Sequence, residues 1–509
     1  VCIEISYDPG YSAKEIGDGI VFSDSSGVSQ LKYDKLKVVD AKGSVLPSSM
    51  RLKQKTHSIM LSFDDTGAVY PIVVDPLVTS YFKNITNNMP ADSYFGRDVD
   101  IDGDTFVVGA SGKDWVYVFT RNNQSADDWG LVANLTDDDG TSNIDYFGGS
   151  VAIFSDTIVV GAYNDDVDGN SSQGSAYVFT RNNQTADDWG QVAKLTASDG
   201  EATDRFGCSV SISYDTIVVG AHGDTNDDDL GAAYVFARNQ GGTDNWGQVT
   251  NLTASDGAAD DYFGYSVAIS GDTIVVGAPY EDVNDDNNGS AYVFSRNQGG
   301  ADNWGQVAKL TASDGKAYDE FGQSVTIEYD TIIVGAKRGD GNESDSGAAY
   351  VFARNHGGAD NWGQVKKIIA SDGVASDEFG SRVSISNDVI VVGALAHTIG
   401  DNAAQGASYV FVRNNPFADD WGQLTKLTDP NGASVDLFGM GVSISGDTVI
   451  IGADGAYNGD NNRAGLVHIF NITGDAWTQI SKPISSDGAA DDYFGYSVSI
   501  SGDTCVVGA

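Results

Sequence analysis

The chain has 509 residues, with 72 acidic and 29 basic side chains and a formal net charge of −43. The acids are 64 Asp and 8 Glu, a bias that favours tight turns over helices because Asp is a turn former and Glu a helix former. Such a charge argues against nucleic acid as a partner, since a phosphate backbone needs Lys and Arg. It suits solubility, cation binding or a salty exterior.

The charge is uneven along the chain. Residues 1–80 carry 10 acids and 8 bases, whereas residues 81–509 carry 62 acids and 21 bases, and the break falls near the segment Pro71–Pro76. We therefore predict a partial β-rich N-terminal region over 1–78 and a repeat domain over 79–509. No apolar stretch reaches about 18 residues, so we expect no membrane span. The start at Val1 and the stop inside a repeat suggest a fragment.

One motif organises the repeat domain. Phe-Gly-x-x-Val, followed by Gly-Ala about fourteen residues later, occurs eight times. The eight Phe residues are Phe95, Phe147, Phe206, Phe263, Phe321, Phe379, Phe438 and Phe494. Their spacings are 52, 59, 57, 58, 58, 59 and 56 residues. So regular a period indicates an array of one supersecondary unit, whose last copy is truncated.

The unit that begins at Phe263 predicts four short strands. Residues 263–269 alternate apolar and polar as a first strand would, and 270–272 form a tight turn. Residues 273–278 are a β-branched apolar run, typical of a strand covered on both faces. An acidic loop leads to 289–294, and a polar loop leads to a half-exposed edge strand over 306–311. Four strands per unit predict an all-β propeller of four-stranded blades, with a β-solenoid as the alternative.

The number of blades has two solutions, and eight is slightly favoured. Tyr81–Thr86 resembles a fourth strand, so the array begins with strand four and ends with strands one and two. In an eight-bladed ring this N-terminal strand completes the last blade and hides its edge. In a seven-bladed ring the same strand finishes the blade of Phe438 and leaves the chain from Trp477 onward as surplus.

Seven of the eight Trp residues occupy one repeat position. They are Trp129, Trp189, Trp246, Trp304, Trp362, Trp421 and Trp477, and an Arg follows the third strand in six units. A ring of Trp platforms could bind sugars. The favoured interpretation is a structural clamp, in which Trp packs on the blade edge and Arg pairs with a neighbouring Asp, because the set recurs in nearly every unit.

These repeats resemble the FG-GAP family, which builds the propeller head of integrin alpha subunits. Phe263-Gly264 and Gly277-Ala278-Pro279 give the motif almost literally, and the likeness covers about 81–509. The chain is most similar in type to secreted microbial FG-GAP proteins. Integrin repeats carry an Asp-x-Asp-x-Asp-Gly calcium hairpin between the first two strands, and here that turn is only Ser270-Gly271-Asp272, so that calcium site does not transfer.

Calcium could instead bind in the loops between the second and third strands. Alternate Asp and Asn side chains let a tight loop place several oxygens around one hard cation. The candidate ligands are Asp282, Asn284, Asp286 and Asn288, then Asp224, Asn226 and Asp228, then Asp166 and Asp168. A solvated acidic loop is the simpler interpretation, because Asp and Asn also form turns. We expect no required cofactor, with Ca²⁺ as the possible ion.

The residue after each Phe-Gly varies most in the first strand, and these residues could line the axial mouth. They are Arg97, Gly149, Cys208, Tyr265, Gln323, Ser381, Met440 and Tyr496. No motif for a nucleophile elbow, a phosphate loop or paired metal-binding His or Cys occurs in the sequence, so no enzyme is predicted. Arg97 meeting acids at the axis would favour an enzyme again.

The family resemblance implies a non-enzymatic, extracellular or cell-surface recognition or adhesion module. Its partner would be a protein or glycan, bound through the acidic loops on one propeller face, where loop variation on a constant scaffold places binding. Nine Asn-x-Ser/Thr sequons are compatible with secretion. The alternatives are a structural surface array without a ligand and, less favoured, a propeller enzyme acting at the axial mouth.

Overall fold

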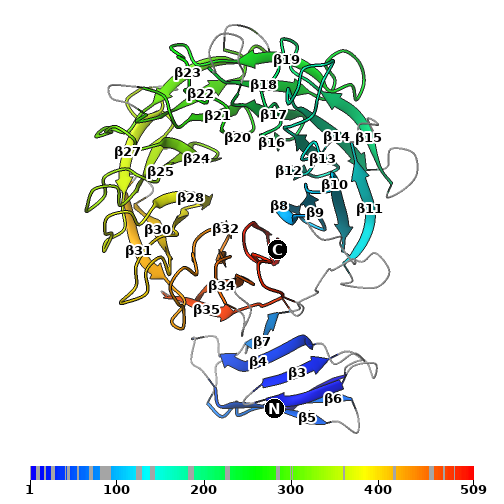
Figure 1. Cartoon of the computed structure of the whole chain (residues 1–509). Coiled ribbons are helices and arrows are strands. Elements are labelled where there is room, and N and C mark those ends of the chain that lie inside the picture. The colour runs from blue at the N-terminus through cyan, green and yellow to red at the C-terminus, as the bar shows by residue number, and fades with distance from the viewer. Residues whose placement is uncertain are drawn as a thin grey trace. The chain divides into compact units, whose positions relative to one another are not determined.

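The computed structural model contains two compact units, Val1–Asn87 and Asn88–Ala509. Every regular element among the described residues is a β-strand, which confirms the all-β prediction (Figure 1). The division between the units, at 87/88, lies nine residues beyond the predicted boundary at 78/79. The structure describes residues 2–6, 12–16, 19–23, 29–39, 42, 46–53, 57–67, 73–80, 93–121, 129–137, 144–181, 188–223, 230–282, 287–298, 300, 302–358, 361–415, 420–457, 463–473, 476–485 and 488–509.

The N-terminal unit contains two antiparallel sheets. One has the order β1 (Cys2–Ser6), β6 (Ser58–Phe63), β5 (Ser48–Lys53), and the other has the order β2 (Ser12–Ile16), β3 (Gly19–Ser23), β4 (Ser29–Val39), β7 (Val73–Ser80). Ile20 and Phe22 of β3 pack against Ile59 and Leu61 of β6. The alternating apolar residues of each sheet thus share one core between two layers.

The second unit is a propeller of four-stranded antiparallel blades, each with its strands in chain order. The first blade is β8 (Phe95–Asp102), β9 (Thr105–Ala110), β10 (Trp115–Thr120) and β11 (Gly130–Thr136). The second is β12 (Ser150–Phe154), β13 (Thr157–Ala162), β14 (Ser175–Arg181) and β15 (Trp189–Leu195). The third is β16 (Ser209–Ser213), β17 (Thr216–Ala221), β18 (Ala232–Ala237) and β19 (Gly247–Leu252). The fourth is β20 (Ser266–Ser270), β21 (Thr273–Ala278), β22 (Ser290–Ser295) and β23 (Gly305–Leu310).

Three more complete blades and one partial unit follow. The fifth blade is β24 (Phe321–Glu328), β25 (Thr331–Ala336), β26 (Ala348–Ala353) and β27 (Gly363–Ile368). The sixth is β28 (Phe379–Ser386), β29 (Val389–Ala394), β30 (Ala407–Asn415) and β31 (Asp420–Leu427). The seventh is β32 (Val442–Ser445), β33 (Thr448–Ala453), β34 (Leu466–Thr473) and β35 (Ala476–Ser481). The eighth repeat contributes only β36 (Val498–Ser501) and β37 (Thr504–Val507).

The eighth repeat lies between the seventh and first blades and completes the ring (Figure 1). Ser497 Oγ donates to the Gly96 carbonyl over 2.6 Å, and the equivalent bond between the fourth and fifth units, from Ser266 Oγ to the Gly322 carbonyl, is 2.8 Å. Arg121 pairs with Asp503 across the same junction at 3.2 Å. The ring therefore holds seven four-stranded blades and an eighth, two-stranded unit.

One part of the blade-number prediction is wrong. The seven-bladed arrangement required Tyr81–Thr86 to finish the blade of Phe438 and left Trp477 outside it. Trp477 instead lies in β35, which pairs with β34 as that blade's own fourth strand. The sequence supplies a complete fourth strand there, so no outside strand is needed. Tyr81–Thr86 itself lies outside the described residues.

Close packing of glycines from neighbouring blades explains why the Phe-Gly and Gly-Ala motifs recur together. A Cβ atom on Gly277 would lie 2.0 Å from the Gly322 carbonyl oxygen of the next unit. The same contact joins the eighth unit to the first, where a Cβ on Gly508 would lie 2.0 Å from the Gly96 oxygen. Only glycine permits so close a backbone approach. The motif therefore marks both sides of a blade junction.

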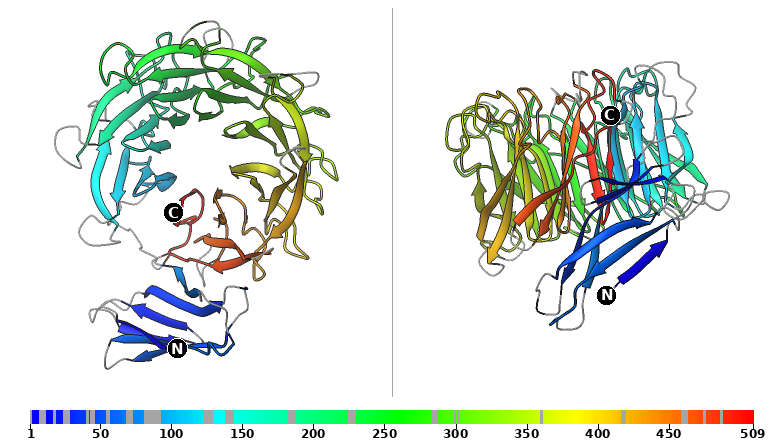
Figure 2. Two further views of the ribbon diagram at one scale, coloured as in Figure 1. Left: turned by 180° about the vertical axis from the view of Figure 1, so that it is seen from behind. Right: turned by 90° about the horizontal axis from the view of Figure 1, so that it is seen from below.

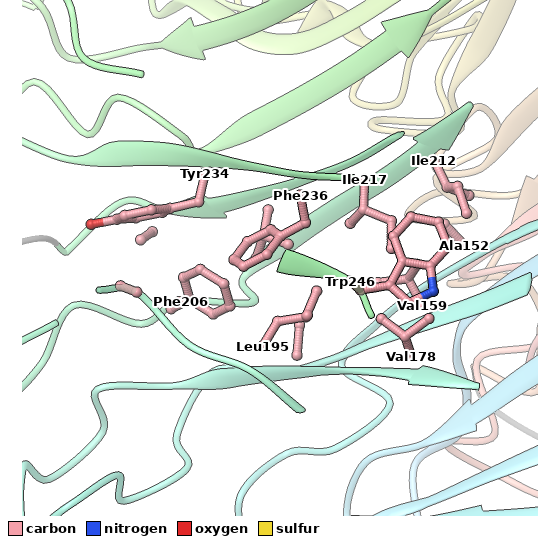
Figure 3. Close-up of a cluster of buried hydrophobic side chains, with 14 of the residues drawn as sticks. Ala152, Val159, Val178, Leu195, Phe206, Ile212, Ile217, Tyr234, Phe236 and Trp246 are labelled. Atoms are coloured by element: carbon pink, nitrogen blue, oxygen red, sulfur yellow. The ribbon is translucent and has the colours of Figure 1, made fainter. Parts of the chain in front are cut away.

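The hydrophobic core lies between neighbouring blades. Phe206 packs edge-on against Phe236, with ring centroids 5.9 Å apart, and Leu195 of the preceding blade belongs to the same cluster (Figure 3). Tyr234 lies at one end of the cluster and Trp246 at the other (Figure 3). The first strand of each blade is nearest the axis and the fourth is outermost (Figure 1), so the middle strands are covered on both sides.

Candidate functional site

Antiparallel strand order sorts the connections onto two faces, between which the strands run (Figure 2). We call the loop face the side that carries the loops from strand two to strand three and from strand four to the next blade. The turn face carries the short turns between strands one and two and the loops from strand three to strand four. The Phe-Gly and Gly-Ala motifs lie at the loop-face ends of their strands.

The Trp residues form the turn-face ends of the blade cores. All seven are buried, with 1–9 % of their surface exposed. The Arg238 guanidinium lies 5.4 Å from the Trp246 ring centroid and pairs with Asp156 of the preceding blade at 2.8 Å and Asp215 at 3.3 Å. A buried indole cannot serve as an open sugar platform. This geometry is that of a clamp between neighbouring blades.

The Phe residues of the motif also belong to the core. Six of them are fully buried, and Phe95 and Phe494 at the eighth junction are partly exposed. Phe263 meets the ring of Tyr292 from the third strand at 5.4 Å in an edge-to-face contact. Such pairs stabilise a blade beyond simple area burial.

A Lys–Asp–Tyr network supports the loop face. Lys309 lies 2.7 Å from Asp256 and 2.6 Å from Glu281, and the Tyr292 hydroxyl donates to Asp256 over 3.0 Å. Burial acts to raise the pKa of Asp256, but hydrogen bonds from Lys309 and Tyr292 outweigh it and lower that pKa. Lys367 and Lys426 make the corresponding contacts in the next two units. These lysines are therefore paired with acids of the propeller itself.

The described calcium candidates make bonds within their own loops. Asp166 accepts a hydrogen bond from the Ser172 amide at 2.8 Å, and Asp282 accepts one from the Asn287 amide at 2.6 Å. Asp168 is exposed and Asn288 is buried. Asn284, Asp286, Asp224, Asn226 and Asp228 lie outside the described residues. Within the described ranges no group of three or more His, Cys, Asp or Glu could hold a metal ion, so calcium binding stays a prediction.

The residues on either side of each Phe-Gly and the first two residues after each Gly-Ala lie beside the axis on the loop face, and we call them the axial rim. In the first four units and the eighth they include aromatic and basic residues, whereas Glu320, Glu378 and Asp454 occupy such positions in the fifth to seventh units. The Arg97 guanidinium lies 4.9 Å from the Tyr496 ring centroid, across the junction of the first and eighth units. Tyr146 and Tyr163 of the second unit stack at 5.1 Å with an interplanar angle of 16°.

The rim continues around the third and fourth units. His222 lies 5.3 Å from Tyr262 and 5.8 Å from Tyr265, and Tyr262 meets Tyr280 at 5.0 Å. Burial and the nearby Arg205 guanidinium lower the pKa of His222 to about 4, so the imidazole is neutral at physiological pH. These contacts link residues from adjacent units into one surface.

The enzyme alternative required Arg97 to meet acids at the axis; among the described residues Arg97 makes no ion pair, and it acts on its sequence neighbour Asp98 only through a small electrostatic attraction. Burial raises the pKa of its neighbour Asp98 to about 7. The Asp98 carboxylate accepts hydrogen bonds from the Val99 amide at 3.1 Å and from the Val151 amide of the second blade at 2.8 Å. Asp100 repeats this bond with Ile153 at 2.9 Å. These acids join the inner strands of two blades.

Sequence reasoning found one part of the rim and missed the rest. It identified the residue after Phe-Gly but not the residue before it. Aligning the eight repeats on Phe would have shown that Tyr or Arg precedes it in five units, at Tyr94, Tyr146, Arg205, Tyr262 and Tyr493. Their mutual contacts depend on which units are neighbours, and that follows only from ring closure.

Comparison with protein families identifies the class. The FG-GAP repeat model matches residues 86–124, 129–179, 189–236, 246–294, 304–352, 362–411, 421–470 and 477–509. The chain therefore belongs to the FG-GAP repeat family. The breaks between the matched segments fall near the loops that join strands three and four, so the matches cover the motif-bearing part of each unit.

Comparisons with individual proteins add the following. A protein of unknown function from Desulfotomaculum acetoxidans is 11 % identical, with a TM-score of 0.42, over 76 % of this chain and 98 % of that one. A hypothetical selenium-binding protein from Sulfolobus tokodaii is also 11 % identical, with a TM-score of 0.41, over 74 % and 91 %. A search of curated proteins found no match. In the part of the chain that the structure describes, no helix could cross a membrane.

Proposed function

We propose that the chain is a non-enzymatic recognition or adhesion module of the cell surface or extracellular space, which binds a protein or glycan through its loop face. The observation that carries this proposal is that the recurring Phe, Gly, Trp and Arg residues pack the blades, whereas the loop-face connections between strands two and three differ from unit to unit on that constant frame. Variable loops on a rigid scaffold are where binding sites commonly lie.

Exposed acids on the loop face supply the chemistry of the proposal. Asp260 and Asp491 occupy equivalent positions, are exposed, and adopt left-handed φ values of 66° and 65°. Asn tolerates this conformation almost as well as Asp, so replacing either Asp by Asn removes charge without straining the loop. Asp302 on the turn face is also exposed, with φ 55°, and Asp302→Asn is a matched control.

Arrays of glycans and extracellular matrix proteins, probed with the full chain in calcium and in chelator, test the proposal. We expect a ligand whose binding falls at least about tenfold, or about 1.4 kcal/mol, in the Asp260→Asn/Asp491→Asn double variant and is unchanged in Asp302→Asn. Absence of any ligand, with the double variant identical to wild type, would favour a structural surface array instead.

A propeller enzyme at the axial mouth is the second candidate, favoured by Arg97 lying beside Asp98 with its raised pKa. The discriminating assay is product analysis after incubation of the full chain with oligosaccharides. Product formation that is lost in Asp98→Asn would support an enzyme, and unchanged oligosaccharides would support the binding module.

A further inference from the structure

The strongest unexplained feature of the propeller is the placement of its remaining basic residues. The clamp Arg residues and the Lys residues of the fourth strands are paired with acids inside the scaffold. Five arginines belong to neither set. Arg338 pairs with Glu320 at 3.3 Å, which leaves Arg97, Arg205, Arg382 and Arg463. All four lie at or beside the axial rim, in a chain with a net charge of −43. They come from different units, with Arg97 in the first unit and Arg205 at the start of the third.

The direct side-chain contacts of Arg97, Arg382 and Arg463 among the described residues are with neutral groups, and acids such as Asp98 and Asp454 act on them only through longer-range attraction. Arg97 lies over the Tyr496 ring, Arg463 donates to the Tyr493 hydroxyl over 3.1 Å, and Arg382 donates to the Ser381 carbonyl over 3.0 Å. Arg205 is exposed. A guanidinium so placed retains donors for an incoming acid, and its planar fork matches a carboxylate.

The first three units bring two of these arginines to one pair of aromatic rings. Tyr146 and Tyr163 are stacked in the second unit, and Arg97 and Arg205 come from the units on either side. Both guanidinium groups act on the Tyr163 hydroxyl and oppose the burial that raises its pKa. Asp98, next to Arg97, accepts from the Val151 amide at 2.8 Å, and the Arg205 amide donates to the Ser172 carbonyl at 3.2 Å, so the chain at both arginines borders the second unit.

Gly149 shows that this arrangement depends on the local sequence. It occupies the position after Phe-Gly, where no other unit has glycine. A Cβ atom at this position would lie 2.9 Å from Cε1 of Tyr163, which is closer than real contacts allow. The missing side chain makes room for the Tyr163 ring beside the stacked Tyr146.

We propose that Arg97, Tyr146, Tyr163 and Arg205 form a binding site for a sugar residue that bears a carboxylate. The C–H face of a pyranose packs on a tyrosine ring while its hydroxyls meet the phenol group, and the carboxylate is bound by the flanking arginines. The acidic remainder of the propeller repels dense polyanions. Screening over about 8 Å at physiological salt lets the local arginines dominate for a single charge.

The site rests on the proposed recognition function of the loop face and names a ligand class for it. The probe is a uronic-acid tetrasaccharide titrated calorimetrically into the full chain. Its comparison ligands are a neutral tetrasaccharide of equal length, a sulfated one and acetate. We expect the uronic tetrasaccharide to bind at least about tenfold more tightly than each comparison ligand, and higher salt to weaken it.

Variants locate the binding. Arg97→Gln and Arg205→Gln should each weaken it about tenfold, and Tyr163→Ala should do so as well. Lys366→Gln, at a partly exposed lysine of an outer strand that pairs with Asp420, and Tyr329→Ala, at a tyrosine of the turn face that is 76 % exposed, are controls that should stay within about twofold. Equal melting temperatures would show that the rim variants are folded.

Several results would overturn the proposal: no binding, equal binding of the neutral tetrasaccharide, binding of acetate or the sulfated sugar alone, or rim variants that bind like wild type. These outcomes are separable from failure of the proposed function. An array ligand lost in Asp260→Asn/Asp491→Asn but kept in the rim variants would leave the recognition module standing. If uronic acid binds and the Asp260→Asn/Asp491→Asn variant has no effect on any ligand, the rim site stands and the proposed role of the acidic loops does not.

Discussion

A single methyl group at a blade junction should destabilise the propeller strongly. In Gly277→Ala the new Cβ would lie 2.0 Å from the Gly322 carbonyl oxygen and 2.4 Å from Ser266 Oγ. Ordinary contacts begin at about 3.4 Å, so the two backbones must separate by more than an ångström. Overpacking a core typically costs about 1–3 kcal/mol. We expect the upper end, about 3 kcal/mol, because the obstructing atom belongs to the backbone of the next blade.

Gly257→Ala is the matched control. Gly257 lies in an exposed loop, and its added Cβ would come no nearer than 3.4 Å, to the Cβ of Ala254. This substitution should be neutral or slightly stabilising, because alanine restricts the unfolded chain. Urea unfolding followed by tryptophan fluorescence measures both variants. Equal midpoints for Gly277→Ala, Gly257→Ala and wild type would refute the glycine-junction explanation of the repeat motif.

Three further predictions concern the Asp98 carboxyl, the Arg–Trp clamp and calcium binding. Burial raises the folded pKa of Asp98 from 3.8 to about 7, so folding favours its protonated form, and this contribution to stability is lost as pH rises from about 4 to about 7. The free energy of unfolding should therefore decline over this range. In Asp98→Asn the decline should be smaller by about 2 kcal/mol, which is less than the full pKa shift would give because the residue is partly exposed. Urea midpoints at pH 5 and pH 8 measure this, and identical slopes would contradict it. Arg238→Gln removes ion pairs to partly exposed acids and a contact with Trp246, and should lower the free energy of unfolding by about 1 kcal/mol, whereas an unchanged urea midpoint would argue against the clamp. If calcium binds, saturating Ca²⁺ should raise the melting temperature relative to chelator, and Asp282→Asn should reduce the rise; no shift would remove the calcium prediction.

The fold could be predicted because its information is repeated in the sequence. Eight copies of Phe-Gly and Gly-Ala, with β-branched runs such as 273–278, specify strands one and two of each unit. The Trp and Arg positions followed from the same period. The ring closure could not be predicted from the repeats alone, because the junction between Gly508 and Gly96 joins residues at opposite ends of the repeat domain. No local pattern distinguishes that junction from the others.

The candidate site was predicted less completely for a related reason. Arg97 could be identified as variable, but its neighbours Tyr496 and Tyr163 come from different units. Periodicity shows that residues share a place in the repeat, whereas a binding site depends on how unlike residues from adjacent repeats meet. The acids of β8 illustrate the same limit, because the hydrogen-bond donor to Asp98 is a backbone amide of the second blade.

Hydrogen–deuterium exchange of the full chain with the uronic-acid tetrasaccharide tests most directly whether the loop face and its axial rim carry recognition. Ligand should slow exchange of amides at 144–149 and 203–208, which adjoin the stacked tyrosines and Arg205. Amides of the turn-face segments 270–273 and 329–331 should be unchanged. Protection confined to the turn face, or none at saturating ligand, would contradict the account.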